Sequence, residues 1–105
     1  MPATDSAVFA ALAEPHRRMI LDALRTDDHS AGDFIDVLPL AQPTISKHLR
    51  LLRETGLVQV RTDAQRRIYS LRAEPLQAVD HWLDPYRVKW RSRLDALERH
   101  LDSLS

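Results

Sequence analysis

The sequence predicts a mainly α-helical fold with one small β-hairpin, arranged as a winged helix-turn-helix of about five helices. Two segments with helical periodicity, about 30–38 and 42–55, are separated by a turn of roughly three or four residues. Directly after Gly56 the hydrophobic period switches to two, which is typical of β-strands. A stripe of apolar residues then recurs every three or four positions almost to the end of the chain.

Composition favours one small domain that covers residues 1–105. The chain contains no cysteine, which excludes disulfides and thiolate metal sites. No apolar run approaches the roughly 20 residues that a membrane-spanning helix needs. The segment 1–12 also lacks the basic region that begins a signal peptide. We therefore expect a cytoplasmic protein that does not bind membranes.

Two helices are expected before the helix-turn-helix. The first, at about 5–13, has Thr4 or Asp5 as a candidate cap. The second begins at Pro15, because the missing N–H of proline is not needed in the first turn of a helix. Its apolar residues are Met19, Ile20, Ala23 and Leu24, and it ends at about 27–29.

The helix-turn-helix carries its own start and stop signals. Ser30 is a plausible N-cap, with Asp33 three residues later as the acidic half of a capping box. Pro39 ends this helix, and Pro43 lies in the first turn of the next one. Gly56 follows the last helical residue and can adopt the left-handed conformation that closes a helix.

The helix at about 42–55 has the chemistry of a DNA-reading element. Ile45, Leu49 and Leu52 fall on one side at helical spacing, with Leu51 on the flank. The other sides and the opening turns carry Thr44, Ser46, Lys47, His48 and Arg50. The DNA major groove admits one helix and offers base-edge acceptors and phosphates to such side chains.

The segment of about 57–72 reads as the wing. Strands are expected at 57–61 and 67–71, around a polar tip at 62–66. Arg61, Arg66 and Arg67 lie at or near this tip, where they can meet a phosphate or a minor groove.

The charge distribution agrees with this interpretation, although the net charge of the chain is zero. Residues 42–72 contain 7 Lys and Arg against 2 Asp and Glu, a net charge of +5. The preceding segment carries −4 and the following segment −1. A positive middle third between acidic ends predicts where a polyanion would bind.

The last segment predicts a long helix at about 75–102, with Pro85 either kinking it or dividing it into two helices. Its aromatic and aliphatic stripe exceeds what a chain of this size can cover, so we expect a homodimer with two-fold symmetry. The interface would combine this helix with the first helix. The residues expected there are Val8, Phe9, Leu12, Leu76, Val79, Trp82, Leu83, Tyr86, Trp90, Leu94, Leu97 and Leu101.

Three segments together resemble the ArsR/SmtB family of winged-helix repressors: 11–24, 42–58 and 66–71. The resemblance implies a homodimeric repressor that binds an operator. It also implies that DNA is faced by Gln42, Thr44, Ser46, Lys47 and His48 on the recognition helix, and by Arg66 and Arg67 in the wing. The chain departs from the family at Ala41, where a Ser or Thr cap is common, at a cost of about 1 kcal/mol. Pro39 stands where relatives often have Gly, which predicts a stiffer turn.

The metal sites of the resembled family are not expected here. One type needs cysteines, which the chain lacks. The type on the C-terminal helix needs an Asp and a His one residue apart, but Asp80 and His81 are adjacent and point about 100° apart. The second half of that site would fall at 91–93, which reads Arg-Ser-Arg. No cofactor is expected, and a non-standard site using His16, His29, His81 or His100 stays open.

An enzyme is also not expected. Ser46 and His48 diverge by about 200° on a helix and cannot hydrogen-bond to each other. Two glycines cannot supply a Gly-rich phosphate loop.

The sequence therefore predicts a homodimeric, sequence-specific regulator of double-stranded DNA, acting as a repressor near its own promoter. Gln42, Thr44, Ser46 and His48 would contact bases, while Lys47, Arg50 and the wing arginines would contact phosphates. His48 could equally serve in helix packing. Two alternatives stay open: a metal-responsive repressor with a non-standard His/Asp site, and a dimeric protein-interaction module that does not bind DNA. The effector is not predicted.

Overall fold

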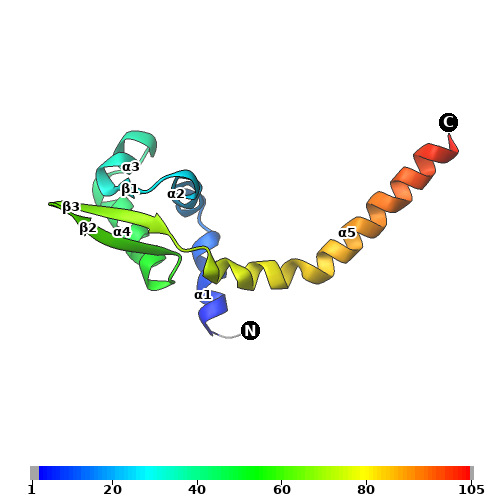
Figure 1. Cartoon of the computed structure of the whole chain (residues 1–105), viewed down its shortest axis with the longest axis horizontal. Coiled ribbons are helices and arrows are strands. Elements are labelled where there is room, and N and C mark those ends of the chain that lie inside the picture. The colour runs from blue at the N-terminus through cyan, green and yellow to red at the C-terminus, as the bar shows by residue number, and fades with distance from the viewer. Residues whose placement is uncertain (1–2, 105) are drawn as a thin grey trace.

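A computed structural model describes residues 3–104 and has the architecture of a winged helix-turn-helix (Figure 1). A helical body carries a β-hairpin at one end, and a long C-terminal helix leaves the body at the other. The α-helices are α1 (Ala3–Leu12), α2 (Pro15–Thr26), α3 (Ala31–Val37), α4 (Gln42–Glu54) and α5 (Gln77–Ser103). The strands are β1 (His29–Ser30), β2 (Val58–Asp63) and β3 (Arg66–Leu71), and a 3₁₀ turn, η1 (Glu74–Leu76), precedes α5.

The three strands form one antiparallel sheet in the order β1-β3-β2. Strand β1 pairs His29 with Tyr69, and it is an element that the sequence did not predict. Two residues are too short to show a period of two, so only the tertiary pairing reveals this strand. The hairpin is also longer than predicted, because Asp63 pairs with Arg66 and the turn contains only Ala64, with a φ of 57°, and Gln65.

The core lies between the helices and the sheet, and it fixes which side of α4 is exposed. Ile45, Leu49 and Leu52 are each at most 1% exposed, as their spacing predicts. They pack in one cluster with residues of the other elements, including Val8, Ile20, Phe34 and Leu57. Because the apolar side of α4 is buried, its polar side faces outward.

The predicted helix ends are largely confirmed. Helix α2 begins at Pro15, with the Glu14 carboxylate accepting the backbone N–H of Arg17 at 2.9 Å. Helix α3 follows Ser30, whose N–H donates to Asp33 Oδ2 at 2.9 Å. Gly56 closes α4 with a φ of 80°.

The end of α4 has the hydrogen bonds of a Schellman motif. The N–H of Leu57 donates to the carbonyl of Leu52 at 3.1 Å, and the N–H of Gly56 donates to the carbonyl of Arg53 at 3.0 Å. The left-handed backbone needed at Gly56 costs any other residue free energy. This turn sends the chain from the recognition helix directly into the hairpin.

The predicted cap of the first helix is wrong. Helix α1 begins at Ala3, so Thr4 and Asp5 lie inside its first turn. An acidic side chain in the first turn still stabilises the helix, because it faces the positive end of the helix dipole.

Helix α4 begins without a side-chain cap, as its sequence predicts. Ala41 is the N-cap, in extended backbone with φ −69° and ψ 151°, and offers no acceptor for the free N–H groups of the first turn. We expect Ala41→Ser to raise the free energy of unfolding by about 1 kcal/mol, because a Ser oxygen at an N-cap accepts one of these N–H groups. Urea unfolding measures the change. Ala41→Val has no such acceptor and serves as the control; an equal gain in both variants would contradict the capping argument.

Helix α5 is one continuous helix through Pro85, and it bends along its length (Figure 1). Pro85 therefore bends the helix and does not divide it into two, which was the other predicted alternative. Beyond η1 and the start of α5 the helix leaves the body, so the chain measures 63 × 33 × 23 Å with a radius of gyration of 18.6 Å. A compact chain of about 100 residues has a radius of about 13 Å. Among the described residues, no helix is long and apolar enough to cross a membrane.

Candidate nucleic-acid interface

The polar side of α4 and the hairpin together enclose a cationic hollow of about 520 Å³. Helix α4 contributes four polar or charged side chains and a proline, and β3 contributes an arginine and a tyrosine. The lining residues are Pro43, Ser46, Lys47, Arg50, Arg53, Arg67 and Tyr69. Four cations with no carboxylate among the lining residues make this concave surface attractive to a polyanion.

The register of the hairpin decides which wing arginine joins this hollow. Residues two apart on a strand share a face, so Arg67 lies on the face of Tyr69, and its Cζ is 5.8 Å from the centre of the Tyr69 ring. Arg61 pairs across the hairpin with Ile68, on the opposite face. There its Nη1 donates to Asp28 Oδ2 at 2.9 Å, so its charge is already paired. Arg66 is exposed at the end of the hairpin.

The remaining residues predicted on α4 take three different positions. Ser46, Lys47 and Arg50 line the hollow. Gln42 and Thr44 are exposed in the first turn of α4 but do not line it. His48 does not line the hollow and instead lies beside Glu14, the N-cap residue of α2.

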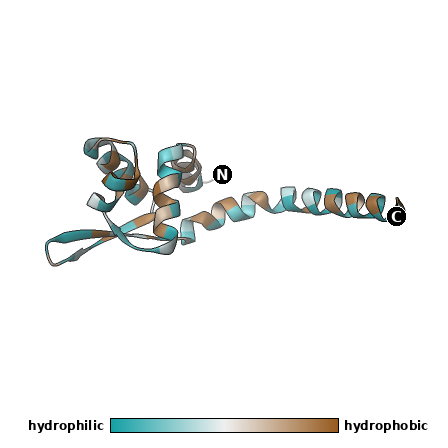
Figure 2. Ribbon diagram, turned by 90° about the horizontal axis from the view of Figure 1, so that it is seen from above, coloured by the Kyte–Doolittle hydropathy of each residue, from teal (hydrophilic) through white to brown (hydrophobic). Residues whose placement is uncertain are grey.

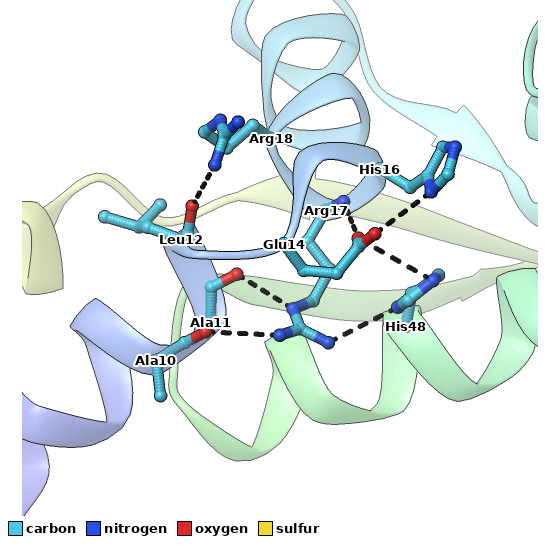
Figure 3. A network of polar contacts seen from close by, with 8 residues as sticks. All are labelled: Ala10, Ala11, Leu12, Glu14, His16, Arg17, Arg18 and His48. Atoms are coloured by element: carbon cyan, nitrogen blue, oxygen red, sulfur yellow. Dashed lines mark hydrogen bonds and ion pairs between the residues drawn. The ribbon is translucent and has the colours of Figure 1, made fainter.

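His48 takes part in a polar network that joins α1, α2 and α4 (Figure 3). Its Nε2 lies 3.8 Å from Glu14 Oε2, and its Nδ1 lies 3.5 Å from Arg17 Nη1. Arg17 also donates to the carbonyl oxygens of Ala11, at 2.8 Å, and Ala10, at 3.2 Å, at the end of α1. The side chain of His48 is only 12% exposed and lies between α2 and α4, a position that agrees with the helix-packing alternative to base contact.

The surroundings of this network set its charge states. Desolvation lowers the pKa of His48 and outweighs the opposing effect of the Glu14 carboxylate, so the neutral imidazole is favoured. Desolvation alone would raise the pKa of Glu14. Hydrogen bonds from Arg17 and His16, with the nearby imidazoles, lower the pKa of Glu14 overall and favour the carboxylate.

Three residues that line the hollow were not predicted to contact DNA: Pro43, Arg53 and Tyr69. Arg53 lies one turn beyond Arg50, on the same side of α4, and helical spacing was sufficient to find it. Tyr69 is only 6% exposed and was assigned simply to a strand. No sequence pattern shows that a buried strand residue also borders a surface hollow.

The residues expected at a dimer interface fall into two groups. Val8 is 1% exposed in the core of its own chain, so it cannot serve as interface; it is buried because α1 packs on α2 and on the start of α5. Leu12, Leu76 and Val79 are also partly buried against that core, and Leu83 is half-buried. Phe9 is half-buried and contacts Trp82 edge-to-face at 5.7 Å between ring centres.

The second group is an exposed stripe along α5, which we call the α5 stripe. Figure 2 shows hydrophobic residues recurring along the helix to its C-terminal end. The stripe comprises Trp82, Tyr86, Trp90, Leu94, Leu97 and Leu101, which are between 46% and 61% exposed. An apolar stripe of this length on a monomer marks an interaction surface.

Comparison with known proteins identifies the family. A helix-turn-helix domain model matches residues 12–61. The transcriptional repressor SdpR of Bacillus subtilis is 36% identical over 76 residues, which cover 72% of this chain and 84% of SdpR. The arsenical resistance operon repressor of Staphylococcus xylosus is 32% identical over 79 residues, or 75% of this chain and 76% of that protein.

A solved structure extends the likeness to nearly the whole chain. The ArsR-like transcriptional regulator from Rhodococcus sp. RHA1 superposes with a TM-score of 0.72 at 31% identity, and the match covers 92% of each chain. These relatives are named as regulators of transcription. With its fold, its cationic recognition helix and these relatives, the chain belongs to the ArsR family of winged helix-turn-helix transcriptional regulators.

Proposed function

We propose that the protein acts in the cytoplasm as a homodimer that represses transcription from an operator near its own promoter. The observation that carries this proposal is the cationic hollow between α4 and β3. Two copies related by two-fold symmetry would place their α4 helices in successive major grooves, about 34 Å apart. The relatives SdpR and the arsenical resistance operon repressor are both named as repressors, which supports this direction of regulation.

The positions of the side chains suggest a division of labour at the DNA. Cations of the hollow, namely Lys47, Arg50, Arg53 and Arg67, would contact phosphates, together with Arg66 at the end of the hairpin. Gln42, Thr44 and Ser46 would contact base edges, since Gln can bind adenine with two hydrogen bonds and hydroxyls suit either kind of base. His48 and Arg61 are given no direct role, because each already has partners within the chain.

The second copy is proposed from the α5 stripe. Its aromatic residues are typical anchors of protein interfaces. The rings of Trp82 and Tyr86 contact each other within the chain, 4.8 Å apart between their centres and tilted by 43°, which positions them in advance for a partner. A two-fold pairing of the stripes would cover them without changing the winged body.

The test is binding to a labelled duplex from the region upstream of the protein's own gene, followed by fluorescence anisotropy over a series of salt concentrations. For a protein that binds DNA phosphates, the logarithm of the binding constant falls linearly with the logarithm of the salt concentration, with a slope of about −0.9 per phosphate neutralised. We expect a steep slope on any duplex and tighter binding to the upstream duplex than to a scrambled one. Arg67→Ala should weaken binding more than Arg61→Ala, because only Arg67 lines the hollow.

If the protein does not bind DNA even at low salt, the proposal that it binds DNA is wrong. The remaining interpretation would then be a dimeric protein-interaction module. Equal losses in the two arginine variants would contradict the assignment of the hollow as the contact surface.

A further inference from the structure

Glu14, His16 and His48 bring three metal-ligating side chains together where the start of α2 meets α4 (Figure 3). We call this group the α2–α4 cluster. One ligand atom from each residue lies within 4.8 Å of the other two. Among the described residues, no other three His, Cys, Asp or Glu side chains converge in this way. The sequence does not show that these three side chains meet, because His48 is more than thirty residues away from Glu14 and His16.

The Glu14 carboxylate stands between the two imidazoles and faces one with each oxygen. Glu14 Oε1 lies 3.0 Å from His16 Nδ1, and Glu14 Oε2 lies 3.8 Å from His48 Nε2. Four-coordinate Zn²⁺ binds N and O ligands at about 2.0–2.2 Å, which places neighbouring ligand atoms roughly 3.4 Å apart. Small side-chain movements would therefore bring all three atoms to one cation, with a water as the fourth ligand.

The cluster is anchored on one side and open on the other. Glu14 is held by the backbone N–H of Arg17, and His48 is only 12% exposed. The His16 side chain is 33% exposed and leaves a route for a cation and its water. Partial burial strengthens the attraction between a carboxylate and a cation.

Arg17 narrows the kind of cation that fits. Its guanidinium lies 3.5 Å from Nδ1 of His48, at the opposite edge of the ring from the proposed ligand atom. This positive charge opposes any cation, so binding must come from strong bonds to imidazole, as transition metals form, and Mg²⁺ and Ca²⁺ are disfavoured. Arg17 can give up its contact with His48 because it keeps its bonds to the carbonyls of Ala10 and Ala11.

We propose that Glu14, His16 and His48 bind a divalent transition-metal cation of the Zn²⁺ or Co²⁺ type, completed by water. The bound ion would tie α4 to the start of α2. His48 directly follows Lys47 in the sequence, so the tie would hold the DNA-facing side of α4 in one orientation. We expect the metal-bound protein to bind its operator more tightly. This consequence for DNA rests on the proposed function, whereas the metal site itself does not.

Titration of Co²⁺ and Zn²⁺ into the metal-free, untagged full chain tests the site. We expect one ion per chain, Co²⁺ absorption bands typical of nitrogen and oxygen ligation, and preferential broadening of the His16 and His48 imidazole resonances in NMR spectra. His16→Gln should lower the affinity at least tenfold, and Glu14→Gln should do the same while keeping an oxygen that can cap α2. The exposed histidines supply controls: His81→Gln and His100→Gln should leave the affinity unchanged.

Three results would overturn the site. They are no binding at millimolar metal, unchanged affinity in His16→Gln, or loss of binding in the His81 or His100 control. Circular dichroism of each variant separates a lost ligand from a lost fold.

The effect on DNA is measured separately, as operator affinity with and without Zn²⁺ for the wild-type chain and for His16→Gln. A gain with Zn²⁺ in the wild type alone supports the coupling. An equal response in both proteins overturns the coupling but not the site. If neither protein binds DNA under any condition, the proposed function fails, while the titration still decides whether the metal site exists.

Discussion

Replacement of Lys47 by alanine is expected to weaken binding to every duplex, whatever its sequence. Lys47 is exposed on α4 and lines the cationic hollow, where its ammonium group would neutralise a phosphate. A homodimer carries two copies, so the slope of log affinity against log salt should become shallower by about 1.8, from about 0.9 per phosphate contact. Anisotropy titrations on the upstream duplex and on a scrambled duplex measure both slopes.

Two further variants make this result specific. Lys89→Ala removes the same charge from an exposed position on α5 and should leave the slope unchanged. Gln42→Ala should instead reduce the preference for the upstream duplex, since a good bidentate base contact contributes about 1–3 kcal/mol of discrimination. If Lys47→Ala and Gln42→Ala change specific and random binding equally, the division between phosphate and base contacts is wrong.

Replacement of Trp90 by aspartate is expected to convert the dimer into monomers at micromolar concentration. Trp90 is 52% exposed within one chain, so the change leaves the chain's own core intact but places a charge in each half of the proposed interface. Loss of the second DNA-binding copy should lower operator affinity by roughly 10²- to 10⁴-fold, because bivalent binding provides a high effective concentration. Sedimentation velocity gives the oligomeric state, and the anisotropy assay gives the affinity.

Val88→Asp is the matched control for Trp90→Asp. Val88 is 65% exposed on the same helix, but it borders a polar face together with Arg91, Ser92, Asp95 and Arg99. We expect this variant to remain dimeric and to bind DNA normally. A dimer that survives Trp90→Asp would show that the α5 stripe is not the interface.

Local rules predicted the helix-turn-helix well, because its signals lie close together in the chain. Helix α2 begins at Pro15, Ser30 and Asp33 begin α3, and Gly56 ends α4, as expected from caps and backbone preferences. The failures are of another kind. Strand β1 is two residues long, and its hydrogen bonds come from β3, almost forty residues later.

At the candidate site, too, the sequence predicted what depends on local spacing but not the contacts between distant segments. Helical spacing placed Ser46, Lys47 and Arg50 on an exposed side of α4, and the structure agrees. The same spacing left His48 open to either base contact or helix packing, because no local rule shows that Glu14 and Arg17, at the start of α2, lie against it. Likewise, the sequence does not show that Arg61 of the wing has a partner, whereas the structure pairs it with Asp28.

The sequence alone determined the helices and the two strands of the hairpin, the buried side of α4 and the location of the positive charge. Each of these depends on side-chain chemistry and on a periodicity within a few turns. Only the tertiary structure decided that Arg67 joins the hollow, that Arg61 does not, and that His48 meets Glu14 and His16. Those outcomes depend on how the hairpin packs beside α4 and β1 and on how α2 packs against α4, because this packing brings together side chains from segments that are distant in the sequence.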